Sequence, residues 1–358
     1  MNQHEPAAQT AALETLLDNV RDSTVRDLAW LLFSRSLLRE QPPLGKVARP
    51  FETADEAAAV EAWLLALDRD AQPLREAMAA SRPTRLGRYA ECLLAYFLTQ
   101  GPAPRLIAAN VALRSAGRTI GECDFLVESA LGRRMHWELA VKCYLHVGGD
   151  RGALADYVGP NLQDRFDVKL ARLLDHQLPL SARDEFASLG HAGPWEAQMF
   201  VKGWLFYRWE EGRSHSLRGA PDAVDPLHAR GFWVTQGQWL SFAESVRLSA
   251  AQSAPQSRAQ CGPAVAWSVL PRLAWLAPRR LAMGGDDGEV DLNAAHSLAE
   301  RLALSGPTMV AAFLPEEGEG GEGDGAPATW REYARGFVVP DDWPQHAEAF
   351  ATGAYHQR

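Results

Sequence analysis

The stretch HWELAVKCYL, residues 136–145, most constrains the fold, because it combines a strand-like apolar pattern with two opposite charges. Side chains along a β-strand point alternately to the two faces of the sheet. One face would be wholly apolar, formed by Trp137, Leu139, Val141, Cys143 and Leu145. The other would carry Glu138 and Lys142. Burying a charge is costly unless it is paired or binds a metal, so this second face is solvent-exposed, an internal ion pair or a functional site.

The elements around this strand follow a simple order. Residues 82–102 have apolar residues at helical spacing and end at Gly101-Pro102, a helix-terminating pair. Two strands joined by the turn SAGR, the charged strand, a helix and a last strand follow, at residues 104–115, 118–129, 133–145, 161–178 and 197–209. The sequence therefore predicts an α/β core with the order helix, three strands, helix, strand.

Two regions of different character flank this core. Residues 1–81 are predicted to be helical, with Thr53 and Glu56 forming a capping box. Residues 211–358 are predicted to be a mixed α+β region. Within it, the glycine-rich acidic stretch 315–327 lacks apolar residues to bury and is expected to be a solvated, flexible loop.

Charge and composition narrow the possible functions. The net charge is −9, and the acidic loop holds five of the acids, so the remainder is only mildly acidic (−9 + 5 = −4). Binding of nucleic acid would thus need a local basic patch. No apolar stretch has the length of a membrane helix and the N-terminus lacks a signal peptide pattern, so a cytoplasmic protein without membrane contact is expected. The four cysteines form no CxxC pair and are predicted to be core residues.

Carboxylates from three elements are candidates for one site. If the strand GECDFLV pairs with the charged strand, Asp124 lies beside Glu138 and Lys142. Helical periodicity places Glu91 at the edge of the apolar face of its helix. Carboxylates near a lysine suit metal-assisted phosphodiester hydrolysis, because Mg²⁺ prefers oxygen ligands and activates water, while a lysine offsets charge in the transition state.

These motifs resemble the PD-(D/E)XK nuclease-like superfamily. LGRYAECLLAYFL, GECDFLV and WELAVKCYL resemble its first helix, its aspartate strand and its glutamate–lysine strand. The resemblance implies a restriction-endonuclease-like core at residues 82–210 and hydrolysis of DNA, or less favoured RNA, with Mg²⁺ or Mn²⁺. It also implies Asp124, Glu138 and Glu91 as metal ligands and Lys142 as the catalytic lysine. More narrowly, RDLAWLL, GPNLQDRFDVKLARLLDHQLPLS and KGWLFY resemble a bacterial family of unknown function grouped with these nucleases.

One spacing departs from the superfamily pattern, which places lysine two residues after the acid. Here Glu138 and Lys142 are four apart. Either Glu138 leans over Ala140 to reach the metal, or the site is degenerate and the fold serves as a nucleic-acid- or protein-binding module. A structural interpretation also remains open, in which Glu138 and Lys142 form an ion pair. A third functional class is an interaction protein that works through its aromatic C-terminal region, although a buried aromatic core is favoured there.

Basic residues near these motifs are candidate contacts to nucleic acid phosphates. Two precede Glu91, two precede the charged strand and one lies on the following helix, namely Arg85, Arg88, Arg133, Arg134 and Lys169. Ordinary solvated positions on helices and turns explain the same residues.

Overall fold

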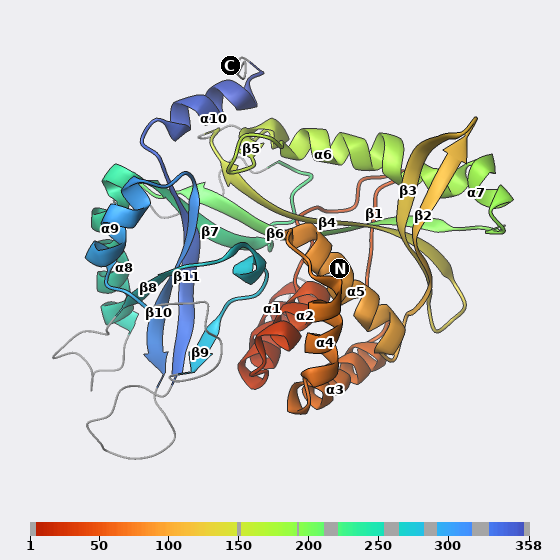
Figure 1. Ribbon diagram of the computed structural model, residues 1–358, viewed down its shortest axis with the longest axis horizontal. Coiled ribbons are helices and arrows are strands. Elements are labelled where there is room, and N and C mark those ends of the chain that lie inside the picture. The colour runs from red at the N-terminus through yellow and green to blue at the C-terminus, as the bar shows by residue number, and fades with distance from the viewer. Residues whose placement is uncertain are drawn as a thin grey trace. The chain divides into compact units, whose positions relative to one another are not determined.

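A computed structural model describes residues 5–148, 152–191, 193–210, 221–253, 265–282, 292–316 and 329–353. The chain is mixed α/β with a large mixed sheet (Figure 1). It divides into two compact units made of alternating segments. Unit 1 comprises Met1–Cys143, Asp164–Trp204 and Ala220–Ala229, and unit 2 comprises Tyr144–Gln163, Leu205–Gly219 and Arg230–Arg358.

Unit 1 begins with helices, as the sequence predicts. They are α1 (Glu5–Asn19), α2 (Ser23–Phe33), α3 (Ala54–Arg69), α4 (Gln72–Ser81) and α5 (Leu86–Gln100). The predicted capping box at the start of α3 is confirmed, since Thr53 Oγ1 accepts from the Glu56 amide at 3.1 Å and Glu56 Oε2 accepts from the Thr53 amide at 3.3 Å. Helix α5 ends before Gly101, as expected.

The sheet of unit 1 has the order β2-β3-β4-β6, and a short strand β1 pairs with β6. These strands are β1 (Lys46–Val47), β2 (Arg105–Ser115), β3 (Arg118–Glu128), β4 (Arg134–His146) and β6 (Glu196–Arg208). The turn between β2 and β3 has positive φ at Ala116 (49°) and Gly117 (78°), the left-handed geometry that suits tight hairpins. The last residues of β4 and β6 belong to unit 2.

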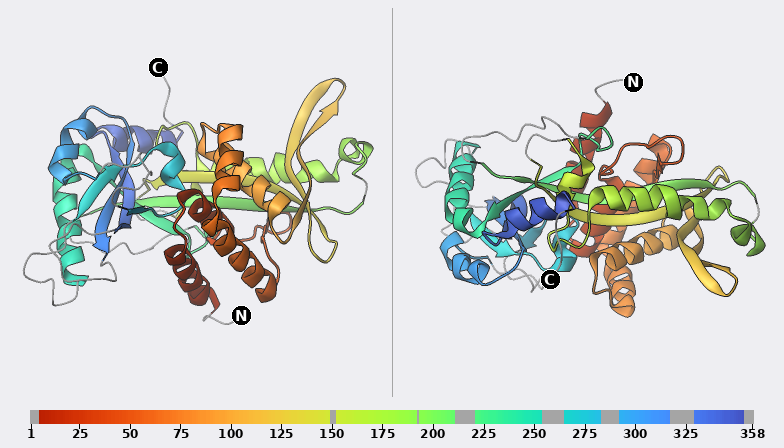
Figure 2. Two further views of the ribbon diagram at one scale, coloured as in Figure 1. Left: turned by 60° about the horizontal axis from the view of Figure 1, so that its bottom comes forward. Right: turned by 90° about the horizontal axis from the view of Figure 1, so that it is seen from above.

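The segment predicted as a helix over residues 161–178 is less regular than expected. It contains α6 (Phe166–Arg172), a π-turn η2 (Leu173–Gln177) and a 3₁₀ turn η3 (Leu178–Ala182), followed by α7 (Asp184–Ser188). Pro179 has no amide hydrogen, so an α-helix cannot continue regularly through it. Leu180 and Phe186 from this segment pack on Leu113, Cys123 and Leu126 of the sheet. Within unit 1 the sheet thus lies between α2–α5 and the α6–α7 segment (Figure 1; Figure 2).

Unit 2 has strands in the order β7-β11-β10-β8, with β9 on β11 and β5 on the end of β4. Its elements are β5 (Tyr157–Val158), β7 (Ala229–Thr235), α8 (Trp239–Ser253), β8 (Ala266–Val269), β9 (Arg280–Ala282), α9 (Ala295–Ala303), β10 (Thr308–Glu316), β11 (Thr329–Val339) and α10 (Trp343–Ala351), with 3₁₀ turns η1 (Leu154–Asp156), η4 (Gln236–Gln238) and η6 (Arg272–Trp275). Pro315 and Glu316 belong to β10, and residues 317–327 of the expected acidic loop lie outside the described residues.

The expected aromatic core is confirmed in unit 2. Phe232, Trp239, Phe242 and Trp267 pack in one cluster with the apolar residues of α9. The ring centroids of Phe232 and Phe242 are 4.1 Å apart, and those of Trp239 and Trp267 are 4.6 Å apart. These rings therefore serve packing. Of the helices in the described ranges, none has the length and apolar character needed to cross a membrane.

Candidate functional site

Strands β3 and β4 part at the position of the two predicted carboxylates. Their antiparallel ladder runs from the pair Glu128–Arg134 to the pair Phe125–Trp137. At the next position, hydrogen bonds from backbone amides to side chains take the place of backbone–backbone hydrogen bonds. Asp124 Oδ2 accepts from the Leu139 amide at 2.9 Å, and Glu138 Oε1 accepts from the Asp124 amide at 3.4 Å. The structure thus brings Asp124 and Glu138 together, as strand pairing predicted.

Glu138 is fully buried and held from three sides. His136 Nε2 lies 2.7 Å from Glu138 Oε1, and the side-chain amide of Gln177 donates to Oε2. His136 Nδ1 in turn lies 3.1 Å from Ser181 Oγ. A buried carboxylate needs such partners, because water is not available to solvate it. This network fixes the position of Glu138 on the face that β4 turns toward the α6–α7 segment.

Asp124 experiences the negative charge of its neighbours. Burial raises the pKa of Asp124 to about 8, with the charge of Glu138 as the next cause and that of Glu91 also contributing, whereas the Leu139 amide and Lys169 act in the opposite direction. Glu91, predicted to lie at the edge of the apolar face of its helix, is therefore close enough for its charge to act on Asp124. Its Oε2 accepts from Arg88 Nη1 at 2.8 Å.

The two lysines do not have the partners that the sequence suggested. Lys142 forms an ion pair with Asp164, so the alternative of a Glu138–Lys142 ion pair is wrong. Lys169, expected on an exposed phosphate-binding surface, donates to Gln177 Oε1 at 2.9 Å. Its pKa is lowered by burial and then by Lys142, while Glu138 and Asp124 raise it. Lys169 is thus linked through the Gln177 amide to the buried Glu138.

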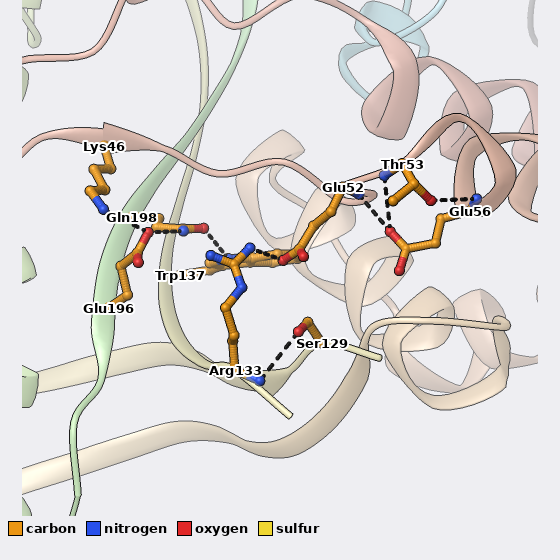
Figure 3. A network of polar contacts seen from close by, with 9 residues as sticks. All are labelled: Lys46, Glu52, Thr53, Glu56, Ser129, Arg133, Trp137, Glu196 and Gln198. Atoms are coloured by element: carbon orange, nitrogen blue, oxygen red, sulfur yellow. Dashed lines mark hydrogen bonds and ion pairs between the residues drawn. The ribbon is translucent and has the colours of Figure 1, made fainter. Parts of the chain in front are cut away.

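The four candidate arginines differ in their exposure and in the residues that they contact. Arg85 and Arg88 are exposed at the start of α5. Arg133 forms an ion pair with Glu52, just before the capping box of α3 (Figure 3). The guanidinium of Arg134 lies 5.7 Å from the ring centre of Trp195. Arg133 and Arg134 therefore have partners within unit 1 at the start of β4, whereas Arg88 contacts Glu91 of the proposed site.

A second possible metal-ligand set lies beside the carboxylates. Among the described residues, Cys123, His136 and Glu138 are buried with potential ligand atoms within 4.8 Å of one another. Thiolate and imidazole ligands are typical of zinc. Burial, followed by the charges of Glu138, Asp124 and Glu122, raises the pKa of the Cys123 thiol. Cys123 also packs against Leu113, Leu126 and Phe186, which fits the core role that the sequence predicted.

Sequence reasoning missed His136, Gln177, Ser181 and Asp164. Strand parity places His136 on the face of Glu138, so this residue carried a usable signal. The others lie in the irregular segment after β4, where periodicity does not report side-chain direction. Gln177 is the last residue of the π-turn, and that turn carries its amide to Glu138. π-turns are frequent at functional sites.

Comparisons with known proteins place the chain in a wider context. No curated protein and no solved structure matches it. One family model matches residues 26–339, and its description is a domain of unknown function, DUF1853. The matched range includes every residue of the site described above.

Proposed function

We propose that this chain, which belongs to the DUF1853 family, is a metal-dependent nuclease that hydrolyses phosphodiester bonds in DNA, with RNA the less favoured substrate. The observation that carries the proposal is the convergence of Asp124 and Glu138 where β3 and β4 part, with Glu91 acting on Asp124. The order α5, β2, β3, β4, α6, β6 supports it, since a PD-(D/E)XK-like, restriction-endonuclease-like core has the order helix, three strands, helix, strand.

The charge balance of the site favours a divalent cation. Repulsion between nearby carboxylates costs stability unless a cation offsets it, and the single ammonium of Lys169 offsets only part of the charge of Asp124 and Glu138. Asp124 and Glu91 supply the hard oxygen ligands that Mg²⁺ and Mn²⁺ prefer. Glu138 Oε2 accepts from Gln177, and a carboxylate offers about four acceptor positions in all. The ligand atoms of Asp124, Glu91 and Glu138 do not all lie within 4.8 Å of one another, so an ion held by all three would have to draw them closer together. When bound, it would polarise the phosphoryl oxygen and lower the pKa of bound water.

The remaining residues would orient the carboxylates and balance charge. His136 and Gln177 hold the two oxygens of Glu138, so the carboxylate keeps one rotamer. Lys142, held by Asp164, is the proposed catalytic lysine, whose ammonium offsets charge that develops on the phosphate. Lys169 lies closer to the carboxylate network through Gln177 and is the competing candidate for that role.

The function is tested with purified protein and a panel of supercoiled, linear, single-stranded and branched DNA, together with RNA. We expect cutting of at least one DNA substrate with Mg²⁺ or Mn²⁺ and no cutting in EDTA. Failure on the whole panel with either metal would contradict the proposal.

Substitution of each lysine by alanine is expected to identify the catalytic lysine. Lys142→Ala should lower turnover at saturating DNA while leaving DNA affinity nearly unchanged, because a lysine that acts in the transition state contributes little to ground-state binding. Lys169→Ala is the matched comparison. If Lys169→Ala lowers turnover and Lys142→Ala only weakens binding, the assignment of Lys142 is wrong and Lys169 takes the role.

Removal of the Gln177 amide is expected to weaken metal binding without removing a ligand. Gln177→Ala should lower Mn²⁺ affinity about 10–100-fold, the usual cost of losing a partner that orients a metal ligand, as measured by titration calorimetry. Gln163→Ala, at an exposed glutamine, is the control and should bind Mn²⁺ as the wild type does. Equal affinity in Gln177→Ala would show that Glu138 does not take part in metal binding.

A second candidate function rests on how many of the acceptor positions of Glu138 are already occupied. Three donors already contact its oxygens, which also suits a catalytically degenerate nuclease fold that binds nucleic acid or protein. DNA binding without metal-dependent cutting would select this candidate. The third class, an interaction surface of aromatic residues, gains no support, since Trp233, Trp239 and Trp267 are buried.

A further inference from the structure

A cleft of about 300 Å³ opens in unit 1 among α4, α5 and the strands β2 and β3. Its lining combines aromatic rings, two carboxamides and a pair of opposite charges, contributed by Tyr96, Phe125, Asn110, Gln100, Arg88 and Glu91. Ligand sites in proteins have this composition, with an apolar wall and a few polar groups that fix orientation. Its volume lies at the lower end of the range for ligand pockets, so its occupant is limited to a small group.

The cleft adjoins the proposed catalytic carboxylates. Glu91 lines it, and the charge of Glu91 acts on Asp124. Asn110 lies between the pairs Ala109–Phe125 and Val111–Cys123, which puts it in register with Asp124 on the neighbouring strand. A ligand in this cleft would therefore lie next to the group that Asp124 and Glu138 are proposed to act on.

Asn110 has an unusual backbone for a residue within a strand. Its φ is +53°, in the left-handed region that only glycine adopts freely and that asparagine tolerates better than most residues. Such conformations cluster at ligand sites, where the surrounding structure maintains them. The exposed carboxamide of Asn110 lines the cleft and offers both a donor and an acceptor, which is the pairing that a nucleobase edge presents.

Arg88 can contact a phosphate without releasing Glu91. Its Nη1 donates to Glu91 Oε2 at 2.8 Å, and its side chain is 54% exposed. A guanidinium has five N–H donors, and charge-assisted bonds from arginine to phosphate are among the stronger polar contacts in proteins. A phosphate at Arg88 would lie beside Glu91, the auxiliary metal ligand of the proposed site.

We propose that this cleft binds one unpaired nucleotide, so that the nuclease acts on single-stranded DNA segments or frayed ends. The inference rests on the proposed function and specifies its substrate. Tyr96 provides the aromatic surface against which a base packs, Asn110 contacts the base edge and Arg88 contacts the phosphate, while the buried Phe125 closes the floor of the cleft. A base inside a duplex is stacked and paired on both sides, so it cannot enter a cleft of this size unless it is first extruded.

The test measures binding of a fluorescein-labelled single-stranded DNA 12-mer and its blunt duplex by anisotropy, in EDTA and in Ca²⁺. Ala95→Leu fills the cleft from α5, and Asn110→Gly removes the carboxamide while keeping the backbone conformation. Ala80→Leu, at an exposed position of α4 outside the cleft, is the matched control. We expect Ala95→Leu to weaken single-strand binding about tenfold, in line with the loss of one stacked base. Asn110→Gly should weaken it less, and the control should bind as the wild type does.

The outcomes separate this inference from the proposed function. Unchanged single-strand binding in both cleft variants, with thermal melts showing that they fold, would overturn the cleft assignment. Metal-dependent cutting of duplex and single strand at equal rates by wild type and Ala95→Leu would also overturn it, while leaving the nuclease proposal intact. Loss of single-strand binding in Ala95→Leu from a wild type that cuts nothing would support the cleft and defeat the nuclease proposal.

Discussion

The variant Asp124→Asn is expected to lose metal-dependent DNA cutting while the metal-free protein becomes more stable. The carboxamide keeps the shape of the side chain but removes the charge that binds the cation, so activity should fall by more than the roughly 100-fold cost of losing an orienting partner of a metal ligand. The stability gain follows because the charge of Asp124 lies half-buried beside Glu138. Functional sites commonly carry such a cost in stability.

The raised pKa of Asp124 also predicts how the stability difference between wild type and Asp124→Asn changes with pH. The pKa of Asp124 is raised from an ordinary 3.8 to about 8 in the folded protein. Between these values the folded state binds more protons than the unfolded state, so stability falls as the pH rises from about 4 to about 8. Asn does not titrate. The stability advantage of Asp124→Asn should therefore be small at pH 4 and largest at pH 8 and above, as measured by thermal melts in EDTA.

Added Mn²⁺ provides the second measurement on the same proteins. A ligand that binds only the folded state stabilises it by about 2.7 kcal/mol at a hundred times its dissociation constant, so wild type should gain melting temperature and Asp124→Asn should not. Asp175→Asn, at an exposed position of the π-turn, is the control and should match wild type throughout. A destabilised Asp124→Asn together with a wild type insensitive to Mn²⁺ would show that the carboxylates are structural.

Gly203→Ala is expected to destabilise the protein severely. Gly203 on β6 has φ +136°, and a Cβ there would lie 1.7 Å from the carbonyl oxygen and 2.9 Å from the amide nitrogen of Lys142. Both clashes are with backbone, so β4 has to move at the position that holds the proposed catalytic lysine. We expect a loss of more than about 4 kcal/mol in the free energy of unfolding by urea. Few single substitutions cost this much, and those that do disrupt the core or the backbone.

A second glycine provides the control for that substitution. Gly87 lies within α5, and a Cβ there would meet nothing within 4 Å. Gly87→Ala should stabilise the protein by up to about 1 kcal/mol, because alanine is the better helix former. A Gly203→Ala protein as stable as wild type would mean that β4 and β6 are not as close at Lys142 as described.

The part of the site that sequence could predict is the part governed by periodicity. Parity along β3 and β4 is enough to bring Asp124 and Glu138 together, and helical spacing is enough to place Glu91 at the edge of α5. The partner of Lys142 was not predictable, because Asp164 lies in an irregular stretch before α6 whose direction no period reports. Gln177 was missed for a related reason, since a π-turn rotates its side chain away from where a regular α-helix would point it.

Unit 1 is built from segments that lie far apart in the sequence, and this has a consequence during synthesis of the chain. Unit 1 needs residues up to Ala229, and Trp30 of α2 stacks on Trp204 of β6 with the ring planes 3° apart. At the usual synthesis rate of about 5–20 residues per second, translation to residue 229 takes roughly 10–45 s. For most of that time, until β6 is synthesised, Trp30 of the buried helix α2 lacks its stacking partner Trp204. The nascent chain should therefore depend on ribosome-associated chaperones until β6 has emerged from the exit tunnel.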